Sequence, residues 1–472
     1  VFKGTLADSP AKLLACLQLN GRIDKELGRL YSYAAMKSDQ DTRRSQYQGM
    51  KQMLQQLVTD YNSKASFVAP EITSMDRAKI DAAIAQEPGL KIYRMYLDDI
   101  LRTKAHRLST GEEKILAQSG LLAAAPVSIY SILSNAELPF AEITLSDGTT
   151  ARLDQAAYGK YRAVPNRADR KAVFDAFFGT FDKFEQTYGA QLSAQVNKDM
   201  FYTRARNYES SLHRALDANN IPVEVYHTLI KNVNNNLDSF HRYLKLKQRM
   251  LGVEQLEYFD VYAPVVEDVE LEYTYEQAVE LVAEALKPLG EDYVGLVKRS
   301  ADERWTDVYP NPGKRSGAYC NGSCYDVHPY MLLNYNGRYN DVSTLAHELG
   351  HAMHSYYSNK AQPYATADYA TFVAEVASTL NEALLIHKML DTIDDDDVRL
   401  SLLMNYLDGV KGTVFRQTQF AEFELAIHET AESGKPLTGD VLTQLYGDVL
   451  KRYYGHEEGV CHVDDLYCVE WA

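Results

Sequence analysis

Residues 344–355 of this 472-residue chain read TLAHELGHAMHS and contain an HExxH run. Apolar residues around the run recur at four-residue spacing, at Leu345, Leu349 and Met353. That spacing predicts a helix with one face turned towards a core, capped at its start by Asp341 or Ser343. Glycine lowers helix stability by about 1 kcal/mol relative to alanine, so Gly350 suggests that another element approaches closely there.

Two histidines of the run lie four residues apart. On a helix, His347 and His351 project from one face and can bind a single metal ion, with Glu348 beside any water on that metal. The alternative is a buried helix whose histidines are hydrogen-bonded core residues. The intervening glutamate favours the metal site. His354 is a weaker candidate ligand, because three side chains from one straight helix converge poorly on a tetrahedral centre.

A catalytic zinc site needs a third protein ligand, which should come from another element. Residues 368–390 are predicted to form a second helix, capped at Thr366 or Asp368. Its apolar residues at four-residue spacing are Phe372, Val376, Leu380 and Leu384. Glu375 lies on the other side among apolar neighbours, where an unpaired carboxylate is unfavourable, and is the predicted third ligand. A solvated carboxylate is the alternative.

Glu382, two turns further on, could accept a hydrogen bond from a ligating imidazole and fix its tautomer.

Several runs around these helices carry a family resemblance. They are GKRSGAY at 313–319, PYMLLNY at 329–335, the HExxH segment at 344–355 and FVAEVASTLNE at 372–382. In these runs the chain resembles the oligopeptidase F branch of the thimet-oligopeptidase-like zinc metallopeptidases, and weaker similarity covers nearly the whole chain. The resemblance implies that His347, His351 and Glu375 hold one zinc ion and that Glu348 is the general base.

The resemblance also implies a reaction, the hydrolysis of short peptides. In the family, a carboxy-terminal segment rich in His and Tyr steadies the tetrahedral intermediate. This sequence opens at Val1 and stops at Ala472, so we expect a short amino-terminal piece and that carboxy-terminal segment to be missing. Candidate substitutes as oxyanion donors are His456, His462, Tyr453, Tyr454 and Tyr467.

Two short apolar segments could bind the peptide backbone. Residues 316–319 and 332–335 are predicted strands. An edge strand beside the metal could pair with an extended substrate without demanding a particular side chain. A hairpin that only packs against the metal helix is the alternative.

Helical periodicity dominates the rest of the chain, with strand signals only at 141–153, 257–263 and 316–335. We therefore expect a mainly α fold with a small β-sheet near the active site. The expected organisation is an amino-terminal helical domain over residues 1–115 and a zinc metallopeptidase domain over residues 116–472. If the first domain covers the HExxH helix, that helix faces a deep substrate channel that excludes folded proteins.

Composition argues against other classes. A formal net charge of −16 disfavours sequence-independent binding to nucleic acid, which needs Lys and Arg to neutralise phosphates. The most apolar stretch, residues 121–133, is too short to span a bilayer. Five cysteines, an odd number, indicate a reducing compartment, and we expect a cytoplasmic protein. The acidic run at 394–397 is predicted to be a helix start rather than a calcium loop.

We therefore expect a cytoplasmic zinc endo-oligopeptidase whose partners are short peptides. The first alternative is a peptide-binding protein or an impaired fragment that keeps the metal but lacks oxyanion donors. The second is a zinc aminopeptidase, which also combines HExxH with a distal glutamate. An aminopeptidase would need a group to hold the free amino terminus, and no matching acidic motif lies upstream.

Overall fold

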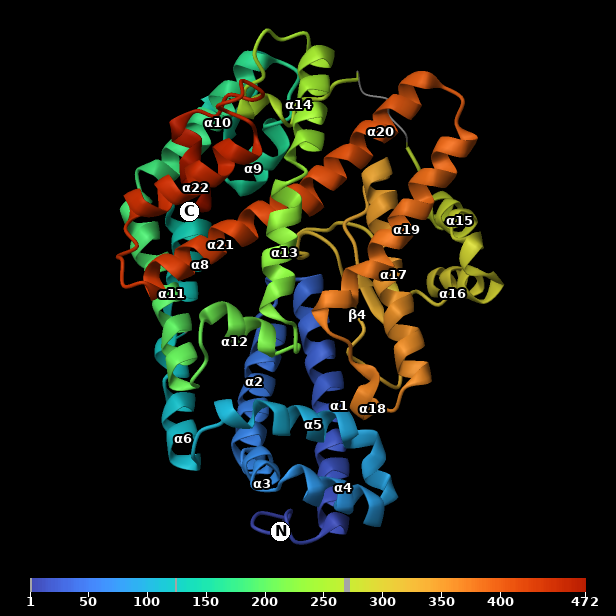
Figure 1. The fold of residues 1–472 in the computed structure, drawn as a ribbon. Coiled ribbons are helices and arrows are strands. Elements are labelled where there is room, and N and C mark those ends of the chain that lie inside the picture. The colour runs from blue at the N-terminus through green and yellow to red at the C-terminus, as the bar shows by residue number, and fades with distance from the viewer. Residues whose placement is uncertain (1, 124, 267–271) are drawn as a thin grey trace. The chain divides into compact units, whose positions relative to one another are not determined.

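The computed structural model describes residues 2–123, 125–266 and 272–472. The chain divides into two compact units, Val1–Thr110 with Glu270–Asp394, and Gly111–Val269 with Asp395–Ala472. Helices make up most of each unit, and the strands are few and short, as expected from the sequence (Figure 1). The division into domains at residues 115 and 116, and the deep channel, stay predictions.

The first unit carries the HExxH run. Its helices are α1 (Pro10–Gln40), α2 (Ser45–Ala65), α3 (Val68–Thr73), α4 (Arg77–Gln86), α5 (Arg94–Arg102), α15 (Tyr275–Ala285), α16 (Glu291–Asp302), α17 (Tyr339–Ala361), α18 (Tyr364–Ala367) and α19 (Thr371–Thr392). Its strands are β3 (Thr306–Asp307), β4 (Tyr319–Asn321) and β5 (Tyr330–Leu332), in the order β3-β5-β4. Pairing is parallel between β3 and β5 and antiparallel between β5 and β4. Strand β4 is therefore an edge.

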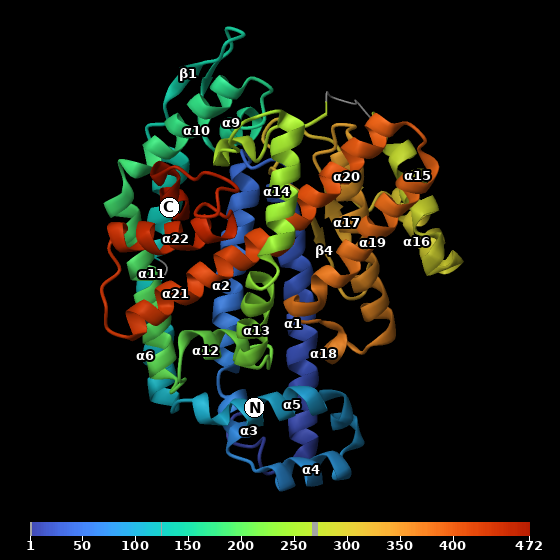
Figure 2. The ribbon, with the colours of Figure 1, turned by 45° about the horizontal axis from the view of Figure 1, so that its top comes forward.

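Figures 1 and 2 both show α1 and α2 side by side as an antiparallel pair. Short helices pack at the amino-terminal end of α1, around a small apolar core. Fully buried members of that core are Leu13, Ile72, Ile80, Leu90 and Leu97. In the same unit, α17 and α19 pack along each other (Figure 1).

The second unit is built on an aromatic-rich core. Its helices are α6 (Thr110–Gln118), α7 (Gly120–Ala123), α8 (Ala125–Ile132), α9 (Gln155–Tyr161), α10 (Arg167–Asp182), α11 (Glu185–Ala205), α12 (Ser211–Asp217), α13 (Val223–Asn234), α14 (Leu237–Leu251), α20 (Asp396–Val410), α21 (Arg416–Glu432) and α22 (Gly439–Tyr453). Strands β1 (Glu142–Thr144) and β2 (Thr150–Arg152) form the expected hairpin. The acidic run begins α20, where Asp395 caps the helix by accepting from the backbone N–H groups of Asp397 and Val398.

One strand prediction is wrong. Within residues 257–263 the structure has a 3-10 turn at Tyr258–Asp260. The reason is a buried carboxylate. Asp260 accepts hydrogen bonds from Arg167 and Arg170 and also caps the turn at the backbone N–H of Glu257. These contacts hold the backbone in a tight turn that apolar periodicity does not reveal.

Among the described helices, none combines the length and the apolar character that a bilayer span requires. The apolar stretch at 121–133 forms parts of α7 and α8 instead.

Candidate metal centre

Helix α17 carries the HExxH run and buries the predicted apolar face. Leu345, Leu349 and Met353 are each at most 2% exposed, as the four-residue spacing predicted. The helix begins at Tyr339, earlier than expected, with Arg338 at the cap position. Asp341 still caps the helix, but from inside its first turn, where its carboxylate accepts from the backbone N–H of Arg338 at 2.9 Å.

Gly350 marks a close contact with α19, as its position inside the helix predicted. A Cβ placed on Gly350 would lie 2.5 Å from the Cα of Ser378 and 2.6 Å from the carbonyl oxygen of Ala377. Only glycine permits this approach, because real Cβ atoms do not come so near to backbone atoms. A buried hydrogen bond joins the same two helices. Asn381 donates from Nδ2 to the carbonyl oxygen of Ala346 at 3.0 Å.

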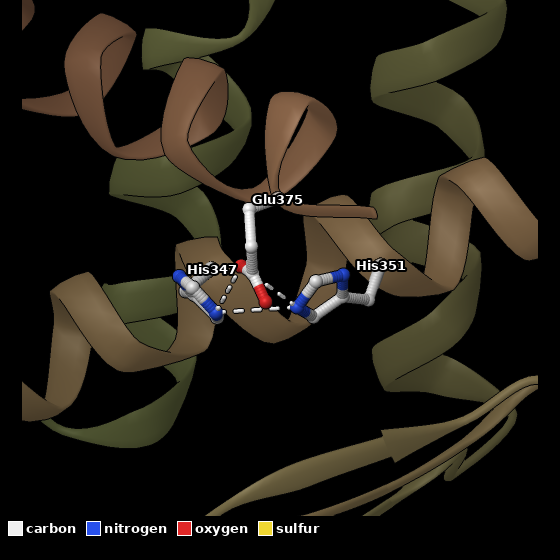
Figure 3. Close-up of side chains that lie close together, drawn as sticks. All are labelled: His347, His351 and Glu375. Carbon is white, nitrogen blue, oxygen red and sulfur yellow. Dashed lines mark hydrogen bonds and ion pairs between the residues drawn. The ribbon is translucent and has the colours of Figure 1, made fainter. Parts of the chain in front are cut away.

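This contact brings three side chains together (Figure 3). His347 Nε2 and His351 Nε2 lie 3.2 Å apart. Oε2 of Glu375 lies 3.3 Å from the first nitrogen and 3.4 Å from the second. Of the described residues, only these three form such a group of possible metal ligands. Within the described part of the chain, neither Cys320 with Cys324 nor Cys461 with Cys468 belongs to a second such group.

The spacing of these atoms fits a tetrahedral zinc ion. Ligand atoms about 2.0 to 2.1 Å from zinc, at tetrahedral corners, lie about 3.3 Å from one another. The three measured separations, 3.2, 3.3 and 3.4 Å, agree with that value. Two imidazole nitrogens and a carboxylate oxygen are also the ligand set that zinc accepts in hydrolytic sites.

Neighbouring groups orient each of these side chains. Glu382 Oε1 lies 2.5 Å from His347 Nδ1 and leaves Nε2 of that ring to face the cluster. The expected hydrogen bond, which Glu382 accepts from the imidazole of His347, is thus confirmed. The hydroxyl of Ser378 donates to Glu375 Oε2 at 2.7 Å, and His351 hydrogen-bonds to the backbone of Ala374.

The two histidines differ in their electrostatic surroundings. For His347, burial lowers the pKa, but the hydrogen bond to Glu382 and the nearby carboxylates outweigh burial, and the net pKa is raised. For His351, burial lowers the pKa in spite of the charge on Glu375. A neutral imidazole is the form that binds a metal.

Glu348 is 6% exposed, and its Oε2 has no hydrogen-bond partner among the residues that the structure describes. Burial raises its pKa to about 7, and the carboxylates of Glu375 and Glu382 add to the shift. A buried carboxylate oxygen whose lone pairs accept no hydrogen bond is available to accept a proton.

Comparison with known proteins gives the family. The model of peptidase family M3 matches residues 161–463, which is more than half of the chain, and a model described as oligopeptidase F matches residues 71–140. The chain belongs to peptidase family M3. Members of this family are zinc metallopeptidases, and membership supports peptide hydrolysis as the reaction class.

Relatives agree with this placement. Oligopeptidase PepF of Bacillus subtilis is 40% identical over 471 residues, covering 100% of this chain and 70% of its own. Group B oligopeptidase PepB of Streptococcus agalactiae is 38% identical, covering 96% of this chain and 75% of its own. A crystal structure of oligoendopeptidase-F from Enterococcus faecium has a TM-score of 0.76 and 32% identity, and the match covers 100% of this chain and 78% of that chain.

His354, the weaker candidate ligand, is not part of the cluster; it stacks on Tyr369 with ring centroids 3.7 Å apart. Two expectations about this M3 peptidase are corrected. The side chain of Glu375 is 63% exposed, so apolar neighbours do not bury it. Helix α19 begins at Thr371 after Ala370, with no side-chain cap, so neither Thr366 nor Asp368 caps it.

The apolar repeat of α19 does not form its buried face. Phe372, Val376 and Leu380 are 46% to 65% exposed. The fully buried positions include Ser378 and Asn381, which touch α17. Sequence reasoning missed Asn381, although its place three residues after Ser378 puts both on one helix face. Small and amide side chains suit this face because the two backbones approach so closely.

The proposed substitute oxyanion donors lie in the second unit and have partners there. Tyr453 donates to Glu422, and Tyr467 donates to Asp175. Nδ1 of His462 lies 2.7 Å from Glu257. His456 accepts from the backbone of Val463, and Tyr454 is 1% exposed. These contacts give the five residues a structural role within the second unit, and none of the contacts supports a role as an oxyanion donor.

Proposed function

We propose that this chain is a zinc-dependent endo-oligopeptidase that hydrolyses short peptides, with one zinc ion held by His347, His351 and Glu375. The observation that carries the proposal is the set of three mutual separations close to those of tetrahedral zinc ligands. Membership of a peptidase family supports the same reaction.

When bound, zinc polarises the scissile carbonyl and acidifies a water molecule. Glu348 takes the proton from the attacking water with its unpartnered Oε2 and later delivers it to the leaving amine. Glu382 holds the His347 ring, and Ser378 holds Glu375, so both ligands keep their orientation through the reaction.

The free edge of β4 supports binding of an extended peptide. Met331 and Leu333 donate their backbone N–H groups to the carbonyl oxygens of Trp305 and Asp307 in the β3 segment. The backbone groups of the residues that alternate with them in β5 therefore face β4. Those residues pair with Tyr319 and Asn321, which leaves the N–H and C=O of Cys320 turned to the open edge. Such an edge binds a peptide through backbone hydrogen bonds and tolerates many side chains.

This edge lies close to the general base. Burial, and to a smaller extent the carboxylate of Glu348, raises the pKa of the Cys320 thiol. Gly322, just past the strand, packs against the side chain of Ser355 on α17. A peptide on the β4 edge would therefore run beside the HExxH helix.

We infer a cytoplasmic location, since all five cysteines are free and four are buried. We also retain as a proposal the division into a helical domain over residues 1–115 and a catalytic domain over residues 116–472.

The test uses the intact chain and a quenched-fluorescent peptide blocked at both ends. We expect chelator-sensitive cleavage, one zinc ion per chain, and a loss of about 10²-fold or more in turnover for Glu348→Gln. Glu280→Gln, which removes an exposed carboxylate paired with Lys298, is the matched control and should keep activity.

The outcomes separate the alternatives. Cleavage of the blocked peptide contradicts an aminopeptidase, because that class needs a free amino terminus. Bound zinc and bound peptide without any turnover would contradict the proposal and favour a peptide-binding protein.

A further inference from the structure

A groove of about 660 Å³ runs between α1, α2 and the segment that contains β4. Two contacts fix the direction of that segment. Thr42, just after α1, donates its backbone N–H to Gly313, and further towards the start of α1 Lys25 pairs with Asp326 at 2.7 Å. Residues 313–326 therefore run antiparallel to α1. Figure 2 shows β4 beside α1.

One face of α1 forms the floor of the groove. The lining residues of this face that matter most are Asp24, Leu27, Tyr31, Ala35, Met36 and Asp39. Apart from the adjacent pair Ala35 and Met36, successive members are three or four positions apart, as on one side of a helix. Helix α2 adds Val58 and Tyr61, and β4 adds Tyr319 and Cys320. The middle of the groove is therefore mostly apolar and aromatic.

The length of the groove suits an oligopeptide. Asp24 and Asp39 are 15 positions apart on α1, which at 1.5 Å per residue is about 22 Å. An extended peptide rises about 3.3 Å per residue, so about six residues fit along it.

Cys320 links the groove to the surroundings of the candidate catalytic site. Cys320 lines the groove, and its backbone N–H and C=O form the free edge of β4. The same residue lies close enough to Glu348 to sense its charge. A peptide held by this edge would place residues from one side of the scissile bond over the floor formed by α1.

The two acidic residues at the ends of the groove differ. Asp39 is 7% exposed and already has partners, since Arg315 lies 3.4 Å away and the hydroxyl of Tyr319 hydrogen-bonds to it. Asp24 is exposed, and within the described part of the chain the only side chain that hydrogen-bonds to its carboxylate is the neutral Tyr61. Its neighbour Lys25 is engaged with Asp326. Among the described residues, no cation lies within ion-pair distance of Asp24.

We propose that this groove is a peptide subsite on one side of the scissile bond, and that Asp24 selects a lysine or arginine side chain there. The proposal rests on the endo-oligopeptidase function. The apolar floor suits the aliphatic stem of such a side chain, and the carboxylate suits its charged end. Tyr61 positions that carboxylate by donating its hydroxyl hydrogen.

The test measures binding, so that it does not depend on turnover. Blocked octapeptides carry one lysine moved along a neutral sequence, with norleucine as the uncharged match, and bind to the zinc-loaded Glu348→Gln chain. At one position lysine should lower the Kd by about fivefold. Asp24→Asn should remove that preference, and Asp24→Lys should replace it by a preference for glutamate at the same position.

Glu26→Gln is the matched control, because it removes an exposed carboxylate of α1 that is absent from the groove lining and pairs with Arg29. It should leave the lysine preference unchanged. The inference is overturned if no position prefers lysine, or if the preference survives in Asp24→Asn. Turnover of the neutral parent peptide by the unmodified chain tests the peptidase function separately, so either proposal can fail alone.

Discussion

Gly350→Ala tests whether the α17–α19 contact sets the metal cluster. An alanine Cβ would lie 2.5 Å from the Cα of Ser378, whereas ordinary contact begins near 3.4 Å. Helix α19 would have to recede by about 0.9 Å, the difference between these distances. Glu375 lies one turn before Ser378, so its carboxylate would move with the helix. Metal–ligand distances tolerate changes of only about 0.2 Å.

Two measurable effects follow. Overpacking costs about 1 to 3 kcal/mol, and alanine regains about 1 kcal/mol of helix propensity, so we expect a net loss of up to about 2 kcal/mol in the free energy of unfolding. Zinc affinity, measured by chelator competition, should fall at least about tenfold, the range seen when a ligand loses its support. Urea unfolding of the metal-free chain reports the first effect.

Gly295→Ala is the control. Gly295 lies inside α16, where an added Cβ meets nothing within 4 Å, so alanine should stabilise the chain by about 0.5 to 1 kcal/mol and leave zinc binding unchanged. The reasoning is refuted if both substitutions change stability in the same direction, or if Gly350→Ala binds zinc as tightly as the unmodified chain.

Two further predictions concern the charged residues Glu382 and Lys247. Glu382→Ala removes the partner of His347 Nδ1 and should lower zinc affinity by about 10- to 100-fold in the same chelator competition; unchanged affinity would show that the ring needs no such support. Lys247 is 1% exposed, and burial lowers its pKa from 10.5 to about 8 despite Asp408 nearby. Below pH 8 this lysine is charged in both the folded and the unfolded state, so the folded state carries the full cost of desolvating the charge. Between pH 8 and 10.5 the lysine loses its proton in the folded state but keeps it in the unfolded state, so this cost fades as the pH rises. Lys247→Met should therefore raise the free energy of unfolding at pH 7 by about 3 kcal/mol, and the gain should shrink as the pH rises through that window. A gain in urea unfolding that is independent of pH would contradict this cause.

The sequence alone predicted the parts of the site that depend on local geometry. Four-residue spacing puts His347 and His351 on one face of any helix, and the apolar repeat of α17 predicts which face is buried. Gly350 signalled a close neighbour for the same local reason, since a helix otherwise disfavours glycine. The mainly α class followed from the same periodicity across the chain.

Tertiary structure decided what local geometry cannot reach. The apolar repeat of α19 pointed to the wrong buried face, because the close approach to α17 requires Ser378 and Asn381 at the contact rather than large side chains. That packing, and not the spacing of residues along the chain, brings Glu375 to the two imidazoles. The groove beside β4 likewise joins α1 to a segment about 290 positions later. Distances between such segments are set by how surfaces pack, and the order of residues within either segment does not contain that information.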